Sequence, residues 1–138
     1  KEDIKGFDKN TITEIAYLSH EEVKSYQRKS QVLLLAVNNV ASAKGIVTGK
    51  IFEYLQAKRP VLAIGPVDGD LAKILKDTNA GTIVGFEDEL RLKSEILKLY
   101  STFKEGNLIV NSIGIEKYHR KELTKELSEI IKEIIPNS

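Results

Sequence analysis

Thr48, Gly49, Lys50 and Glu53 are the residues whose types and spacing suggest chemistry. They stand where a long polar loop leads into a predicted helix that runs from near Gly49 to about Lys58. Backbone N–H groups at a helix start bind anions, and loops that follow parallel strands lie at the edge of the sheet where α/β proteins bind ligands. Glu53 comes one turn into this helix and off its apolar face, where a carboxylate can accept hydrogen bonds from ribose hydroxyls. The segment therefore predicts an anion site with a hydroxyl-binding carboxylate beside it.

A plainer interpretation of Glu53 also stays open at this point. The residue can be a surface carboxylate that pairs with Lys50 or Lys58 in the same helix. Exposed charges of this kind usually have no special role.

The glycines of this loop do not form a Walker A motif. Only three residues separate Gly45 from Gly49, where that motif has four, and Ile51 stands where Ser or Thr must bind magnesium. The sequence also lacks the GxGxxG pattern of dinucleotide-binding proteins.

The remaining titratable residues have ordinary explanations. His20 lies at a predicted helix start, where surface or capping use competes with ligand contact, and His119 lies among charged residues of a solvated helix face. Asp68 and Asp70 can form a metal pair, but turn and capping chemistry explain them better. With two His and no Cys, a transition-metal site is not expected, and no catalytic triad is visible.

Apolar runs and helical periodicity predict an α/β fold. Strands are predicted at Thr11–Leu18, Gln31–Val37, Pro60–Gly65 and Thr82–Gly85. Helices are predicted at His20–Lys29, Gly49–Lys58, Leu71–Asp77, Glu87–Phe103 and Glu116–Ile135. This alternation predicts a Rossmann-like open parallel sheet with helices on both faces.

Capping residues define several of these helix ends. Ser19 and Glu22 have the spacing of a capping box, and Asp70 is predicted to cap the short helix after it. Asn79 is expected to end that helix, since it tolerates positive φ.

Length and charge exclude several classes of protein. The chain has 138 residues, which suffices for one domain with a real core, spanning residues 1–138. Its net charge is +1, so no nucleic-acid partner is predicted, and no apolar run is long enough to cross a bilayer.

The segment Lys44–Leu62, which reads KGIVTGKIFEYLQAKRPVL, resembles the donor-site signature of GT-B-type glycosyltransferases. It is similar to the mostly retaining group that includes sucrose-synthase-like and capsule or lipopolysaccharide enzymes. The flanking segments agree over roughly residues 10–135, so the match is long although each motif is short. The resemblance implies the C-terminal, donor-nucleotide-binding domain of such an enzyme, without its first strands and its N-terminal acceptor domain.

The resemblance also implies roles for individual residues. Glu53 matches the glutamate that binds the donor ribose, and Thr48, Gly49 and Lys50 fall where that family faces the donor diphosphate.

Two further positions follow from the same resemblance. Ser19 and His20 fall near the nucleobase. Gly45 stands where the family often has a second glutamate that faces the sugar, which is a departure from the pattern. No catalytic residue, metal or cofactor is implied within this chain.

The implied reaction is transfer of a sugar from a nucleotide-diphosphate donor to a hydroxyl of a glycan or lipid-linked acceptor. The missing acceptor domain would bind that acceptor, so this chain alone is expected to be inactive. We expect a cytoplasmic protein that can lie at the inner face of the membrane. The competing interpretation is a non-catalytic nucleotide- or anion-binding regulatory module.

The implied sheet raises a question of strand pairing. In the family's order 3-2-1-4-5-6, the first two strands separate the strand like Thr11–Leu18 from the strand like Gln31–Val37. Without them, Thr11–Leu18 can close up beside Gln31–Val37 to give a four-stranded sheet, a separate piece can supply the strands, or two copies can pair edge to edge. We expect self-association, to which the apolar stripe of Glu116–Ile135 would add.

Overall fold

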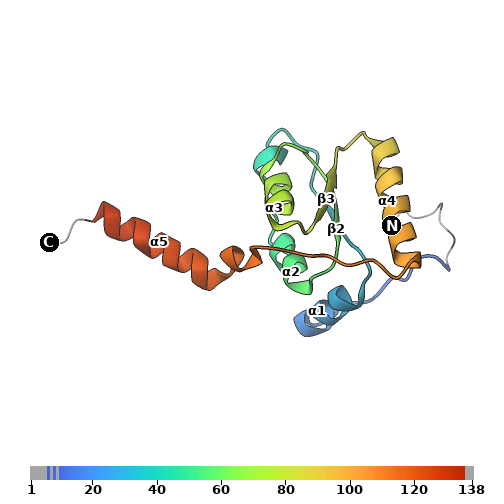
Figure 1. Cartoon of the computed structure of the whole chain (residues 1–138), viewed down its shortest axis with the longest axis horizontal. Helices are drawn as coiled ribbons and strands as arrows, with labels where there is room; N and C mark the ends of the chain where they lie inside the picture. Colours follow the sequence, from blue (N-terminus) through green and yellow to red (C-terminus); the bar gives the residue numbers. More distant parts are fainter. Residues whose placement is uncertain (1–5, 7, 9, 136–138) are drawn as a thin grey trace.

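The predicted α/β fold with an open parallel sheet is confirmed by the computed structural model, which describes residue 6, residue 8 and residues 10–135 (Figure 1). The described strands form one parallel sheet in the order β1-β2-β3. Its strands are β1 (Leu33–Ala36), β2 (Val61–Ile64) and β3 (Gly81–Val84). The helices are α1 (His20–Lys29), α2 (Lys50–Ala57), α3 (Asp70–Thr78), α4 (Glu89–Lys104) and α5 (Arg120–Ile134), with short 3-10 turns η1 (Ala43–Gly45) and η2 (Ile115–Tyr118).

The register of the sheet follows from the apolar runs. Leu33 of β1 stands beside Val61 of β2, which stands beside Gly81 of β3. Residues of the central strand β2 are buried on both faces, whereas along β1 the buried Leu33 and Leu35 alternate with exposed neighbours. An edge strand with one covered face produces this alternation.

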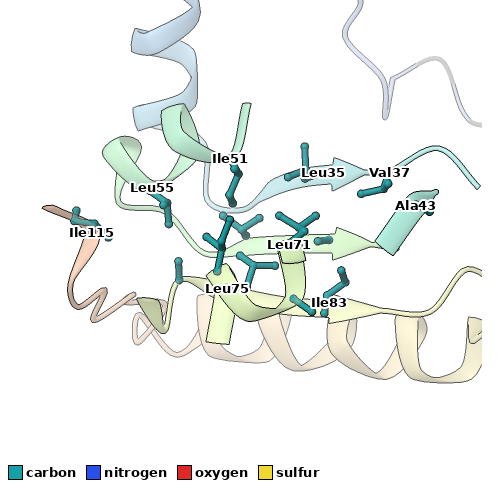
Figure 2. Close-up of a cluster of buried hydrophobic side chains, with 14 residues drawn as sticks. Leu35, Val37, Ala43, Ile51, Leu55, Leu71, Leu75, Ile83 and Ile115 are labelled. Carbon is teal, nitrogen blue, oxygen red and sulfur yellow. The ribbon is translucent and has the colours of Figure 1, made fainter. Parts of the chain in front are cut away.

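Helices α2 and α3 cover one face of the sheet and make the core (Figures 1 and 2). Ile51 and Leu55 of α2 and Leu71 and Leu75 of α3 are almost fully buried there. They pack against inward side chains of all three strands, namely Leu35, Val61, Ala63 and Ile83. Burying a side chain of this size stabilises the fold by about 1.5–3 kcal/mol, so this face holds the domain together.

Helix α4 lies on the other side of the sheet and covers it loosely (Figure 1). Its side chains Ile96, Tyr100 and Phe103 stay about half exposed, while Leu62 of β2 and Val84 of β3 are buried beneath them. Helices therefore cover both faces, as predicted, but the cover above β1 is incomplete.

The predicted strand Thr11–Leu18 is wrong. The segment joins no sheet in the described chain, and every residue in it except the partly buried Leu18 is exposed, Tyr17 to 99%. A run of β-formers needs a neighbouring strand that satisfies its backbone, and none lies beside this segment. The four-stranded sheet is therefore not formed, and β1 is an edge.

The predicted single helix Glu116–Ile135 is also wrong, because the chain forms η2 first and then α5. His119 between them is extended, with φ −70° and ψ 138°. Buried Ile115 and the contact of Tyr118 with Phe52, with ring centroids 5.8 Å apart, hold η2 on the body, whereas α5 projects away from it (Figure 1). Tertiary anchoring of the first turn overrides the continuous helical pattern.

The predicted capping was mostly right. Ser19 and Glu22 form both hydrogen bonds of the capping box, and Asn79 ends α3 with φ 50°. Asp70 does not cap α3, since Gly69 holds the cap position and Asp70 begins the helix itself, where it pairs with Lys73 at 3.1 Å.

No helix in the described part of the chain is both long enough and apolar enough to cross a bilayer.

Gly81 is required by the close approach of β3 to β2. A Cβ atom built there would lie 1.9 Å from the carbonyl oxygen of Val61. We expect Gly81→Ala to lower the free energy of unfolding by about 3 kcal/mol, because backbone atoms must move apart. Urea denaturation measures this loss. Gly45→Ala is the matched control, since nothing lies within 4 Å of its Cβ position; equal stability of the two variants would contradict the prediction.

Candidate functional site

Helix α1 packs against α2 through its last turn. Gln27 of α1 hydrogen-bonds to Glu53 near the start of α2, and one residue later the carbonyl of Arg28 accepts a 2.7 Å hydrogen bond from Nε of Arg59, just beyond the end of α2. Neither contact involves Ser19 or His20, which lie about two turns earlier in α1. These contacts therefore bring the end of α1 to Glu53 but do not bring Ser19 and His20 to Gly49 and Lys50.

The start of α1 is closed by its own side chains. The Glu22 carboxylate accepts hydrogen bonds from the N–H of Ser19 at 2.8 Å and from its hydroxyl at 2.6 Å. These two bonds lower the pKa of Glu22 from its usual value, and the bond from the hydroxyl has the larger effect. Of the predicted nucleobase contacts, Ser19 is therefore engaged in capping, and His20 beside it is exposed.

The start of α2 is open by comparison. Gly49 occupies the cap position, and no side chain caps it. The first helical hydrogen bonds run from Ile51 to the carbonyl of Thr48 at 3.1 Å and from Phe52 to that of Gly49 at 3.2 Å. Gly49 and Lys50 are exposed, so this start is accessible to an anion.

The loop before α2 is folded against the body. Ala43 of η1 is buried, and the Cβ position of Gly69 lies only 2.8 Å from the carbonyl oxygen of Lys44. Gly45 in the same turn is exposed and has nothing within 4 Å of its Cβ position, so a side chain would fit there.

Asp68 and Asp70 each form an ion pair with a lysine. Lys44 pairs with Asp68, and its hydrogen bond holds the pKa of that carboxyl below its usual value. Asp70 pairs with Lys73. The described residues contain no cluster of three or more His, Cys, Asp or Glu that could hold a metal ion.

Glu53 lies half-buried between α1 and α2. The Gln27 side-chain amide donates to Oε2 of Glu53 at 3.1 Å. Glu53 thus pairs with Gln27, and not with Lys50 or Lys58 as in the plain interpretation. A pocket of about 230 Å³ opens at this point, lined by Lys24, Gln27, Arg28, Glu53, Gln56 and Ala57.

The chemistry of this pocket is polar and mixed in charge. One carboxylate and two side-chain amides offer hydrogen-bond partners to hydroxyl groups, and two cationic side chains stand at the same walls. Lys24 also pairs with Glu21 at 2.9 Å. Burial, and next the charge of Glu53, raise the pKa of Tyr54, whose hydroxyl lies 3.4 Å from the carbonyl oxygen of Leu34 and does not line the pocket.

Three lining residues come from α1 and were not predicted as site residues. Lys24, Gln27 and Arg28 recur at the spacing of one helix face. That polar stripe is visible in the sequence, but only the packing of α1 on α2 turns it toward Glu53.

A larger depression of about 530 Å³ lies at the other end of α2. It is lined by Gln56, Lys58, Ile115, Glu116 and His119. It lies at the end of α2 away from Gly49, and none of the residues predicted to bind the donor lines it. We therefore place the candidate site at Glu53.

The Gln27–Glu53 hydrogen bond can be measured without a ligand. We expect Gln27→Leu and Glu53→Leu to be non-additive in the free energy of unfolding, with a coupling of about 0.5–1.5 kcal/mol, because each removes the same half-buried bond. A double-mutant cycle by chemical denaturation gives this value. Pairing Gln27→Leu with Glu129→Leu on α5 is the control and should be additive. Full additivity in the first cycle would show that the bond contributes nothing in solution.

The capping box predicts a pH dependence. Because the folded-state pKa of Glu22 is lowered from 4.5, its contribution to stability is present above that pH and is lost as the pH falls through the lowered value. We expect the difference in unfolding free energy between wild type and Glu22→Gln to shrink over that range. Thermal unfolding followed from neutral to acidic pH tests this, and a difference that does not change with pH would contradict it.

Comparison with known proteins found no relative of this chain. No family model matches it, no curated protein matches it, and no solved structure matches it. The likeness to GT-B glycosyltransferases accordingly stands on the residues of Lys44–Leu62 and their surroundings.

Proposed function

We propose that this chain is the donor-binding half of a glycosyltransferase that uses a nucleotide-diphosphate sugar. One observation carries the proposal: the carboxylate of Glu53 is held half-buried in a polar pocket, one turn from the uncapped start of α2. The sequence resemblance independently assigns the ribose to this same residue.

The arrangement supports a division of tasks between neighbouring groups. Glu53 accepts hydrogen bonds from the ribose hydroxyls while Gln27 keeps the carboxylate oriented. The open start of α2, with exposed Gly49 and Lys50, takes the diphosphate. Thr48, the last loop residue before Gly49, has a buried hydroxyl with no hydrogen-bond partner in the described chain.

The chemical task of this half is electrostatic. Negative charge builds on the leaving diphosphate as its bond to the sugar breaks, and oriented backbone N–H groups with a nearby ammonium stabilise that charge. No side chain of this chain acts as nucleophile in the proposal. The acceptor hydroxyl and any group that activates it belong to a second domain.

A matched pair of variants tests the proposal. We expect Glu53→Gln to weaken binding of UDP, GDP or ADP, whichever the wild type binds, by about 1–3 kcal/mol, since the variant loses a charged acceptor for the ribose hydroxyls. Isothermal titration calorimetry measures this, with Glu129→Gln on the exposed face of α5 as control. A 2′,3′-dideoxy nucleotide should bind both forms equally.

Three results would count against the proposal. Failure of the wild type to bind any of the three nucleotides would remove the function itself. Binding that Glu53→Gln leaves unchanged would place the ribose elsewhere. Binding without transfer in a protein that also carries an acceptor domain would favour a regulatory nucleotide-binding module instead.

A further inference from the structure

The outer edge of β1 carries backbone groups that no strand in the described chain satisfies. In the order β1-β2-β3, β1 has a neighbour on one side only. The N–H groups of Leu33 and Val37 donate across to the β2 side at 2.9 Å. Because the directions alternate along a strand, the N–H and C=O groups of Leu34 and Ala36 point outward.

One of these outward groups has a weak internal partner. The hydroxyl of Tyr54 lies 3.4 Å from the carbonyl oxygen of Leu34, which is at the long limit for a hydrogen bond. A backbone N–H of a pairing strand could donate to the Leu34 carbonyl at an ordinary hydrogen-bond distance, and this bond would replace the weak one from Tyr54.

The side chains beside this edge are apolar and uncovered. Leu34 is 60% exposed although it stands in the middle of a strand. Next to it, an apolar groove of about 310 Å³ opens between the sheet and α4, with Val32, Leu62, Tyr100 and Phe103 among its walls. Both the backbone edge and the face next to it thus lack a partner.

Charge selects the kind of partner. Residues 31–37 contain no Lys, Arg, Asp or Glu, and no Pro, which are the residues that usually protect an edge strand from pairing. Two copies of this segment can meet without repulsion between like charges. A strongly charged partner would find nothing to pair with along this edge.

We propose that two copies of this chain associate through antiparallel pairing of their β1 strands about a two-fold axis. The axis passes beside Leu35, so Leu34 of each copy exchanges both backbone hydrogen bonds with Ala36 of the second copy. The result is one continuous sheet in the order β3-β2-β1-β1-β2-β3. The two Leu34 side chains lie on the face of the grooves and cover part of each.

This interface is independent of the proposed nucleotide site, and it is separate from the exposed apolar stripe of α5. Helix α5 exposes Leu123, Leu127 and Ile130 along one stripe. It starts directly after η2, which Ile115 and Tyr118 hold on the opposite side of the core from α4. Helix α5 therefore does not cover the groove of its own chain.

Sedimentation equilibrium of the whole chain at tens of micromolar tests the proposal. We expect a dimer whose dissociation constant rises by roughly tenfold or more in Leu34→Lys, because two ammonium groups are brought together at an apolar interface. Leu90→Lys on α4, at a side chain that is 86% exposed, is the matched control and should leave the dimer intact. Ala36→Pro is a second variant, since it removes an outward N–H that β2 does not use.

Amide exchange locates the interface. We expect the N–H groups of Leu34 and Ala36 to exchange slowly in the dimer and quickly on dilution. A wild type that sediments as a monomer would overturn the proposal. So would a dimer that survives Leu34→Lys and is lost in Leu127→Lys, because α5 would then form the interface. Slow exchange of both amides in a monomer would show that another part of the same chain covers the edge.

Discussion

The pairing of β2 with both neighbouring strands is the constraint on which the rest of this structure depends. β2 is hydrogen-bonded on both sides and buried on both faces, so its position sets the register of β1 and β3. Helix α2 connects β1 to β2, and helix α3 connects β2 to β3. The apolar residues of both helices can be buried only over the strands that they join. Parallel pairing therefore brings the starts of these helices to the carboxyl edge of the sheet.

The candidate site is a consequence of that packing plus one further contact. Helix α1 belongs to no strand connection between β1 and β3, yet it packs against α2 and faces Glu53 with Lys24, Gln27 and Arg28. The carboxylate is thereby held by a neutral amide rather than neutralised by a lysine. A carboxylate held in this way keeps its acceptor capacity for hydroxyl groups, which is the property that the proposed ribose contact requires.

Apolar surface remains uncovered beside β1 and along α5, and the causes differ. The edge and groove beside β1 are uncovered because α4 packs loosely and because Thr11–Leu18 does not pair. Helix α5 is uncovered because η2 is anchored in the core and directs the chain outward. The first surface offers backbone groups as well as side chains, so it specifies a strand as its partner, whereas the second specifies only an apolar face.

The sequence by itself determined the local elements and the class of fold. Uninterrupted apolar runs defined β1, β2 and β3, helical spacing defined α2, α3 and α4, and Ser19, Glu22 and Asn79 marked helix ends, since capping depends on neighbours within a few residues. The position of Glu53 one turn into α2 could also be predicted from the sequence. Tertiary structure alone decided that Thr11–Leu18 stays unpaired, that η2 separates from α5, and that Gln27 rather than a lysine meets Glu53. Each of these depends on contacts between segments far apart in the chain, and local propensity carries no information about which distant neighbour is present.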